Sequence, residues 1–323
     1  MRKLPRIVFI GGTQFSLFSL KELFINKYNI VGIITNPDNL IYRRNASRTI
    51  IMNPIKKYAL ENHIPLLQPK NLLDSSFFKN LKIWNADIQI VVSFRILPKK
   101  VWGSPKMGTF NLHASLLPQY RGFSPINWTI INGEKKTGLT TFFISNKIDS
   151  GNILLQKEVK IGEEETAGEL ENRLKKMSGS IILETLEGIL EKKIIPLPQE
   201  DRSSSPLKNA PKISTQSCRI HWNENSIETI YNKIRGLSPV PTAWTILFLN
   251  KKRFFRFKIF VVKKIRKKHF FPIGLVIISL YKMKISVKEG FISVIECQME
   301  GKKKMNIKNL INGIKIRKNI FVQ

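Results

Sequence analysis

The chain has 323 residues, of which 42% are apolar, and a formal net charge of +31. This length predicts two domains, and the apolar content can fill ordinary hydrophobic cores, which excludes wholesale disorder. The large positive charge indicates a polyanionic partner, with nucleic acid ahead of a membrane surface. Part of the lysine excess has a second explanation in an AT-biased coding sequence, because Ile, Lys and Asn are frequent throughout.

The N-terminal half alternates short apolar runs with helical patterns. We expect strands at residues 6–10, 30–34, 87–92, 108–112 and 139–144, and helices at residues 15–25 and 54–61. This alternation predicts an α/β domain with a doubly wound, mostly parallel sheet, whose ligand cleft lies at the carboxyl ends of the strands. Gly11 and Gly12 follow the first strand without the spacing of a dinucleotide-binding motif, so we interpret them as a tight turn.

Residues 38–54 are polar and poor in apolar side chains, which is typical of a mobile surface loop. The segment carries three arginines, Arg43, Arg44 and Arg48. A solvated charged loop and a nucleic-acid contact explain them about equally well.

Three polar residues between Gly108 and Gly151 form the candidate catalytic set. Asn111 and His113 are two residues apart on the expected strand, so their side chains share one face. The Asn111 amide can stabilise an oxygen that gains negative charge, and His113 can move a proton or stay charged beside the reacting carbon. Asp149 can fix the imidazole tautomer and favour its cationic form. No serine or cysteine is placed as a nucleophile, which favours direct attack by a bound amine. The alternative is purely structural, with strand-end capping and a turn.

The rest of the chain predicts a long helix, a linker and a second domain. Residues 166–192 are amphipathic and helical, residues 194–210 are rich in Pro and Ser, and residues 226–235 are again helical. Short alternating segments at 244–249, 254–262, 274–278, 290–295 and 314–316 favour a small antiparallel barrel. Residues 251–268 hold ten Lys or Arg and no acid, interleaved with four phenylalanines that we expect mainly in the core. A cationic exterior of this kind suits phosphate contacts.

Cysteine content and hydropathy favour a soluble protein of a reducing compartment. Cys218 and Cys297 are too few for a disulfide framework or a zinc site, so we expect no metal. The N-terminus shows no signal peptide, and the apolar run at residues 270–281 is too short to span a bilayer.

The motifs resemble those of the folate-dependent formyltransferases. The resemblance is carried by Asn111-x-His113-Ala-Ser115-Leu116-Leu117-Pro118, then Tyr120-Arg121-Gly122 and Asp149-Ser150-Gly151. Within this superfamily the chain is most similar to the methionyl-tRNA formyltransferase family. That similarity extends along the full length, through Thr35-Asn36-Pro37-Asp38, Glu165-Thr166-Ala167-Gly168-Glu169-Leu170, Ala210-Pro211-Lys212-Ile213 and Ile220-His221-Trp222.

The resemblance implies a Rossmann-like formyltransferase domain at residues 1–193, a linker at 194–210 and a basic OB-like tRNA-binding domain at 211–323. It implies transfer of a formyl group from 10-formyltetrahydrofolate, as co-substrate, to the amino group of methionyl initiator tRNA for translation initiation. Asn111, His113 and Asp149 would then be catalytic. The folate would be bound by Ser115, Leu116, Leu117 and Pro118, and the tRNA by Arg43, Arg44, Arg48, Lys251, Lys252 and Arg253. We expect a cytoplasmic monomer without a membrane partner.

Other functions remain open on the sequence alone. A formyltransferase acting on a nucleotide-sugar amine would share the N-terminal core but would not need so basic a C-terminal domain. A formyltetrahydrofolate hydrolase would use water in place of the amine. A non-catalytic RNA-binding protein would explain the charge but not Asn111, His113 and Asp149. The acceptor of the formyl group distinguishes these alternatives.

Overall fold

The computed structural model describes residues 4–42, 48–199, 206–223, 226–250, 253–313 and 320–323. The chain divides into two compact units. The first comprises residues 1–122, 138–159 and 171–209, and the second comprises residues 123–137, 160–170 and 210–323. Helix α6 (Ala167–Leu190) contributes its first turn to the second unit and the rest to the first.

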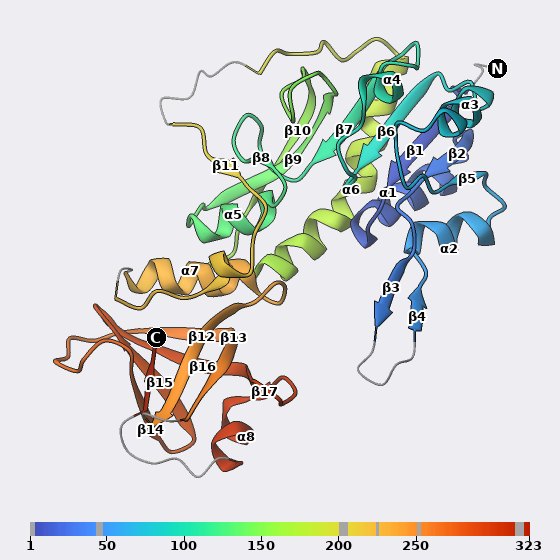
Figure 1. Cartoon of the computed structure of the whole chain (residues 1–323). Coiled ribbons are helices and arrows are strands. Elements are labelled where there is room, and N and C mark those ends of the chain that lie inside the picture. Colours follow the sequence, from blue (N-terminus) through green and yellow to red (C-terminus); the bar gives the residue numbers. More distant parts are fainter. Residues whose placement is uncertain (1–3, 43–47, 200–205, 224–225, 251–252, 314–319) are drawn as a thin grey trace. The chain divides into compact units, whose positions relative to one another are not determined.

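The first unit is built on a seven-stranded sheet in the order β10-β9-β7-β6-β1-β2-β5 (Figure 1). Its strands are β1 (Ile7–Gly11), β2 (Ile30–Ile34), β5 (Leu66–Leu67), β6 (Ile88–Val92), β7 (Thr109–His113), β9 (Lys136–Phe143) and β10 (Ile153–Lys160). β5, β2, β1, β6 and β7 run parallel, and β9 is antiparallel to β7. The expected mostly parallel sheet is confirmed. The inner strands β1 and β2 are apolar along their whole length because helices cover both faces of the sheet.

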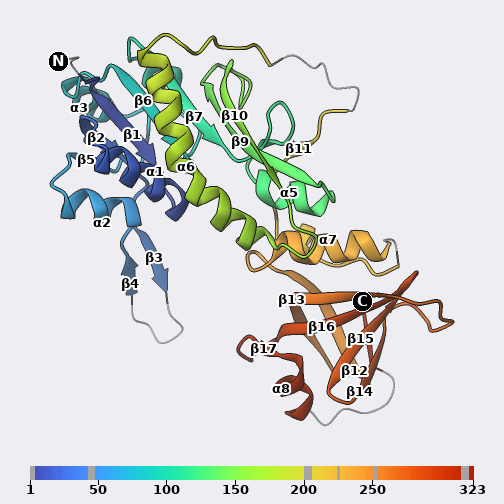
Figure 2. The same ribbon diagram turned by 180° about the vertical axis from the view of Figure 1, so that it is seen from behind.

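Helices lie on both faces of this sheet (Figure 2). Val8 and Ile10 of β1 pack with Phe77 and Leu81 of α3 (Ser75–Ile83) and with Val101 of α4 (Lys99–Trp102). On the other side, α1 (Gln14–Ile25) contacts β1 and β6, and its Ser19 hydroxyl donates to the Ser178 hydroxyl of α6 at 2.9 Å. The remaining helix, α2 (Pro54–Glu61), contacts α1 and β5.

Residues 38–54, expected to be a mobile surface loop, contain a short β-hairpin. β3 (Asn39–Tyr42) pairs antiparallel with β4 (Arg48–Ile51), and residues 43–47 lie outside the described part of the chain. Asp38 anchors the base of the hairpin, because its carboxylate accepts the Asn53 N–H at 3.0 Å and contacts Lys56 Nζ at 2.5 Å. The hydrogen bond from Lys56 holds the pKa of Asp38 below its ordinary value. Polar composition does not specify strand pairing, so it could not predict this hairpin.

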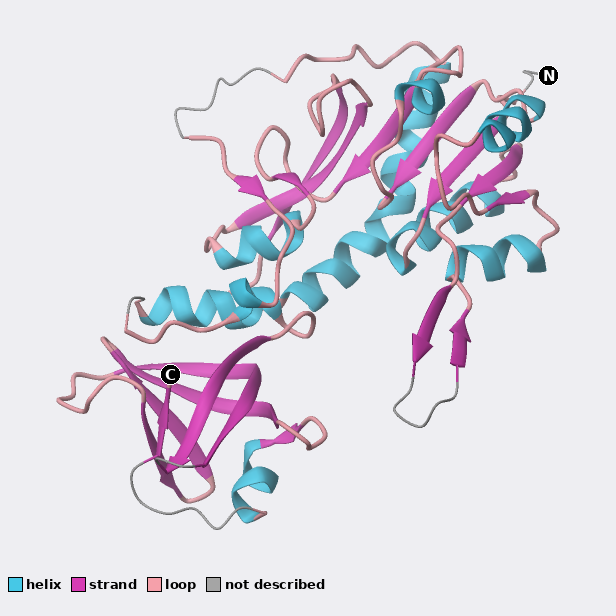
Figure 3. Ribbon diagram, viewed as in Figure 1, coloured by secondary structure: helices cyan, strands magenta, loops and turns pink. Residues whose placement is uncertain are grey.

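A closed barrel forms most of the second unit (Figure 3). Six strands close it in the order β13-β12-β18-β14-β15-β16, because β13 also pairs with β16, and every pair is antiparallel. The strands are β12 (Ala243–Asn250), β13 (Arg253–Arg266), β14 (Leu275–Ser279), β15 (Lys282–Val287), β16 (Gly290–Met299) and β18 (Ile320–Val322). The expected small barrel is confirmed. The strand expected at residues 314–316 falls outside the described residues.

Helix α7 (Ile227–Leu237) closes the barrel core with an apolar face that includes Ile230 and Ile234. The other elements of this unit are α5 (Pro125–Ile131), η1 (Gln216–Cys218), β17 (Met305–Asn306) and α8 (Ile307–Asn312). Of the two-residue strands, β8 (Arg121–Gly122) lies at the end of the first segment of the first unit, and β11 (Asn209–Ala210) crosses from the first unit to the second.

The phenylalanines of β13 do not all lie in the barrel core. Phe257 and Phe260 are buried, Phe255 is half-buried and Phe254 is 60% exposed. Ile259 and Phe260 are neighbours and both are buried, because the register of β13 against β16 shifts at this point. A bulge of this kind adds a residue to one strand and changes which side chains face inward. Strict alternation of inward-facing and outward-facing residues therefore predicted only some of the buried side chains of β13.

Candidate active site

Asn111 and His113 lie on the inner strand β7, between β6 and β9, as predicted. In the register of the sheet, Asn111 is opposite Val91 of β6 and Phe142 of β9, and His113 is opposite Thr140 of β9. Strand geometry places both polar side chains on one face and Leu112, which is buried, on the other. The site therefore lies at the carboxyl end of a parallel strand, where open α/β sheets bind their ligands.

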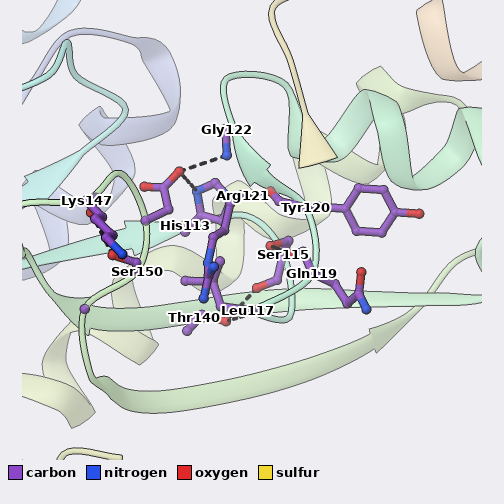
Figure 4. A network of polar contacts seen from close by, with 12 residues as sticks. His113, Ser115, Leu117, Gln119, Tyr120, Arg121, Gly122, Thr140, Lys147 and Ser150 are labelled. Atoms are coloured by element: carbon purple, nitrogen blue, oxygen red, sulfur yellow. Dashed lines mark hydrogen bonds and ion pairs between the residues drawn. The ribbon is translucent and has the colours of Figure 1, made fainter. Parts of the chain in front are cut away.

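Both ring nitrogens of His113 face an oxygen atom (Figure 4). Nε2 lies 2.8 Å from the carbonyl oxygen of Tyr120, and Nδ1 lies 3.7 Å from Asp149 Oδ2. A carbonyl oxygen can only accept a hydrogen bond, so Nε2 carries a proton. In the neutral ring Nδ1 would then direct a lone pair at the carboxylate, whereas the protonated ring directs an N–H at it. Only a ring with an N–H at both nitrogens would direct a donor at each of these oxygens.

Asp149 is fixed by the loop that carries it. Its φ angle is 50°, in the left-handed region, and its Oδ2 accepts the Gly122 N–H at 2.9 Å. No described residue donates a hydrogen bond to Oδ1. A Cβ at Gly151 would lie 1.7 Å from the Phe143 carbonyl oxygen, so only glycine fits at this position. The structure thus brings together His113 and Asp149, which are 36 residues apart in the sequence, and places Asn111 on the same strand as His113.

The Asn111 side chain is half-buried and its carboxamide is not used by the fold. Its Oδ1 is buried, and no described residue donates a hydrogen bond to it. A buried polar atom without a partner costs free energy, and such atoms in native structures are commonly completed by a ligand or an ordered water. Asn111 is therefore available to a bound substrate, in contrast to His113 and Asp149, which contact each other.

The segment Ser115–Pro118 is held in place by polar contacts from β9 and β10. The Thr140 hydroxyl donates to the Ser115 carbonyl oxygen at 2.6 Å and accepts the Leu117 N–H at 3.2 Å. Gln156 Nε2 donates to the Leu117 carbonyl oxygen and to Thr140 Oγ1, both at 2.9 Å. Ser115 and Leu117 are buried, and the Ser115 hydroxyl donates to the Gln119 carbonyl oxygen at 2.7 Å. Leu116 and Pro118 remain partly exposed.

Sequence reasoning missed the groups that support this site. Thr140 and Gln156 lie 25 and 39 residues from the atoms that they hold, and no local pattern marks them. The Tyr120 carbonyl that orients His113 is a backbone group, so no residue type reveals it. The positive φ of Tyr120, 61°, sets the direction of this carbonyl, and it is a property of the folded loop.

Most of the basic residues that were predicted to bind tRNA lie outside the described part of the chain. Arg43, Arg44, Lys251 and Lys252 lie outside it, and nothing is described of the Arg48 side chain at the start of β4. Arg253, the first residue of β13, is exposed, and its guanidinium carbon lies 5.4 Å from the centre of the Phe255 ring. Arg48 and Arg253 belong to different units.

Two further findings concern the described residues alone. They contain no group of three or more His, Cys, Asp or Glu side chains arranged to hold a metal ion. Among the described helices, none is both long and apolar enough to cross a membrane.

Comparison with protein families matches both parts of the chain. Residues 5–186 match the formyl transferase family model, and residues 212–315 match the model of the formyl transferase C-terminal domain. A methionyl-tRNA formyltransferase of Bacteroides thetaiotaomicron is 43% identical over 313 residues, covering 96% of each chain. A methionyl-tRNA formyltransferase of Flavobacterium johnsoniae is 45% identical over 314 residues, covering 97% of each chain.

Solved structures share the fold at low sequence identity. HypX from Aquifex aeolicus, in complex with tetrahydrofolic acid, matches with a TM-score of 0.64 and 16% identity over 96% of this chain and 47% of the other. WlaRD, a sugar 3N-formyl transferase, matches with a TM-score of 0.63 and 22% identity over 93% of this chain and all of the other. At these identities the matches support the fold and leave the acceptor open.

Proposed function

The chain belongs to the formyl transferase family, and we propose that it transfers a formyl group from 10-formyltetrahydrofolate to the amino group of methionyl initiator tRNA. The products are N-formylmethionyl-tRNA and tetrahydrofolate. One observation carries the choice of acceptor. Relatives named methionyl-tRNA formyltransferase match this chain at 40–46% identity over nearly its whole length, the C-terminal domain included.

Asn111 is proposed to bind the formyl oxygen. When the amine attacks the formyl carbon, negative charge develops on this oxygen, and a fixed N–H donor lowers the energy of that state. The Asn111 carboxamide can donate through its Nδ2–H groups, while its buried Oδ1, which has no hydrogen-bond partner among the described residues, can accept an N–H of the substrate.

His113 and Asp149 are proposed to act as a charged pair. With Nε2 donating to the Tyr120 carbonyl, a protonated His113 places positive charge beside the developing oxyanion and directs Nδ1–H at Asp149. Asp149 Oδ2 already accepts the Gly122 N–H, which leaves Oδ1 to take the proton that the attacking amine loses. The bond from the formyl carbon to the folate nitrogen then breaks, and that nitrogen takes up the proton that Asp149 accepted from the amine.

The folate is proposed to lie against the segment Ser115–Pro118. Since Ser115 and Leu117 are buried and occupied with holding the segment, their contribution is to its shape. Leu116 and Pro118 are partly exposed and are the members available for apolar contact with the folate.

The tRNA is proposed to be bound by positive charge at two places. One is the group Arg43, Arg44 and Arg48 of the β3–β4 segment, and the other is the start of β13 with Lys251, Lys252 and Arg253. In this proposal residues 1–193 are the catalytic domain, 194–210 the linker and 211–323 the tRNA-binding domain of a cytoplasmic monomer. The net charge of +31 supports it, because phosphate contacts account for much of nucleic-acid affinity.

The test is transfer of labelled formyl from 10-formyltetrahydrofolate by the purified chain. Methionyl initiator tRNA, methionyl elongator tRNA, a nucleotide-linked amino sugar and a reaction without acceptor are compared. We expect label on the initiator tRNA alone. Label on the amino sugar would reassign the acceptor, and tetrahydrofolate release without any acceptor would indicate a hydrolase. No turnover of the folate in any of the four reactions would refute the proposed function.

A further inference from the structure

The segment expected to serve only as a linker is attached to the first unit at its beginning. The Ile153 N–H donates to the Leu197 carbonyl at 2.7 Å, and the Leu197 N–H donates back to the Ile153 carbonyl at 2.8 Å. These two residues form an isolated antiparallel bridge. Two residues further along this register, Gln199 is opposite Gly151, next to the loop that carries Asp149.

The Gln199 carboxamide connects two parts of the candidate active site. Its Nε2 donates to the carbonyl oxygens of Asp149 at 3.0 Å and Gly151 at 2.8 Å. Its Oε1 accepts from Arg121 Nε at 3.1 Å and Nη2 at 2.8 Å. Arg121 directly precedes Gly122, whose N–H binds Asp149 Oδ2. One side chain therefore holds both the backbone of Asp149 and the segment that donates to its carboxylate.

The Asp149 backbone needs such support. Its φ of 50° is unfavourable for a residue with a Cβ, and conformations of this kind persist where surrounding contacts enforce them. The separation of 3.7 Å between Asp149 Oδ2 and His113 Nδ1 depends on this conformation. A shift of the loop by about 1 Å would change the electrostatic contact and the reach of the carboxylate, and errors of this size cost about 100-fold in rate at catalytic sites.

We propose that Gln199 is a positioning residue for the transfer reaction. By binding the Asp149 and Gly151 carbonyls, it holds the Asp149 carboxylate in its position beside His113. This inference depends on the proposed formyl transfer. Glutamine suits the position because it both accepts from a guanidinium and donates to two carbonyls. Glutamate at this position would accept from Arg121 but could donate to neither carbonyl, and it would add a negative charge beside Asp149.

The competing explanation is that Gln199 only fastens the chain as it leaves the first unit. The two explanations differ in what they predict for catalysis. Fastening affects stability and leaves the reaction unchanged in the folded protein. Positioning lowers kcat while the KM values of folate and tRNA change little, because Gln199 contacts neither substrate in the proposed reaction.

The experiment compares wild type, Gln199→Ala, Gln199→Glu and Gln298→Ala in the full chain. Gln298 is the matched control, since its carboxamide also donates to a backbone carbonyl, that of Lys302 at 2.9 Å, but within the second unit. We expect kcat to fall about 10- to 100-fold in both Gln199 variants, with both KM values within about threefold of wild type. Gln298→Ala should retain wild-type kcat. Hydrogen–deuterium exchange should accelerate at residues 149–151 in the Gln199 variants only.

Each outcome bears on the inference. Wild-type kcat in Gln199→Ala, or in Gln199→Glu if the alanine variant does not fold, would overturn the positioning role while leaving the proposed function intact. Exchange at residues 149–151 that stays at the wild-type rate would overturn it as well. If wild type itself transfers no formyl group, the proposed function fails and the positioning role fails with it.

Discussion

Two neighbouring threonines of β9 provide a test of how the candidate folate segment is held. Thr140 and Thr141 are both fully buried, and their hydroxyls lie on opposite faces of the sheet. Thr140 supports Ser115 and Leu117, whereas Thr141 bonds the Thr185 hydroxyl of α6 at 2.8 Å. Valine has nearly the same shape as threonine, so Thr140→Val and Thr141→Val each remove a hydroxyl without leaving a large cavity.

The contacts predict different costs for the two changes. Thr140→Val leaves the Ser115 carbonyl and the Leu117 N–H buried without this partner; each such group costs about 1–3 kcal/mol, and at about 1.5 kcal/mol each the total is about 3 kcal/mol. Thr141→Val leaves the Thr185 hydroxyl still donating to the Ile181 carbonyl at 2.7 Å, so about 1 kcal/mol is expected. For domains of this size, 1 kcal/mol corresponds to a shift in Tm of about 2–4 °C. Thr140→Val should therefore lower the Tm by about 6–12 °C, and Thr141→Val by a third of this.

Kinetics then separate the site from general stability. Thr140→Val frees the segment Ser115–Pro118, and we expect KM for the folate to rise about tenfold, which equals a loss of about 1.4 kcal/mol of binding free energy. Thr141→Val should leave this KM unchanged. Thermal melts and initial rates with varied folate and saturating tRNA provide both values. An equal rise of the folate KM in the two variants, or no rise in Thr140→Val, would refute the idea that the Thr140 hydroxyl shapes the folate site.

Four further predictions follow from the structure and the proposed mechanism. Asn111→Ala and His113→Ala should each lower kcat by about 100-fold or more while the melting curve stays near wild type; near-normal turnover would contradict their catalytic roles. Replacing Arg43, Arg44 and Arg48 together by alanine should raise KM for tRNA and leave that for folate unchanged, and unchanged tRNA kinetics would exclude the contact. Since Lys56 lowers the pKa of Asp38, this pair should stabilise the protein at neutral pH and lose that effect as the pH falls through the lowered pKa. The Lys56→Met variant should therefore lose less Tm on acidification than wild type. A pH dependence of Tm that is the same in both proteins would exclude the anchor. Burial raises the pKa of the Cys297 thiol to about 12, so it should resist alkylation at pH 8 until the protein unfolds, and rapid labelling of native protein would show that this strand opens.

Local sequence patterns predicted much of the framework correctly. The mainly apolar runs that become β1, β2 and β6 need only the identity of their own residues, because a strand covered on both faces is mainly apolar. The helix expected at residues 166–192 is α6 at Ala167–Leu190, since its apolar spacing repeats over many turns. Helix α7 begins beside Ser226, whose hydroxyl accepts the Thr229 N–H at 3.1 Å, which is also a local signal.

Patterns failed where the outcome depends on distant partners. The hairpin of β3 and β4 and the barrel closure between β13 and β16 both require pairing between strands, which composition does not specify. The bulge that buries Phe260 beside Ile259 likewise depends on the register against β16. The residue types of these segments are compatible with the observed strand pairing, but they do not determine it.

The same division applies to the candidate site. Asn111 and His113 could be assigned to one face from their spacing alone, because side chains on a strand alternate. Their use depends on groups far along the chain. The Tyr120 carbonyl sets the tautomer of His113, Gly122 holds the Asp149 carboxylate, and Gln199 contacts the Asp149 backbone. The sequence by itself determined which chemical groups are present and on which strand face they lie. Only the tertiary structure decided which atoms meet, because hydrogen bonds act over about 3 Å between segments that the folded chain alone brings together.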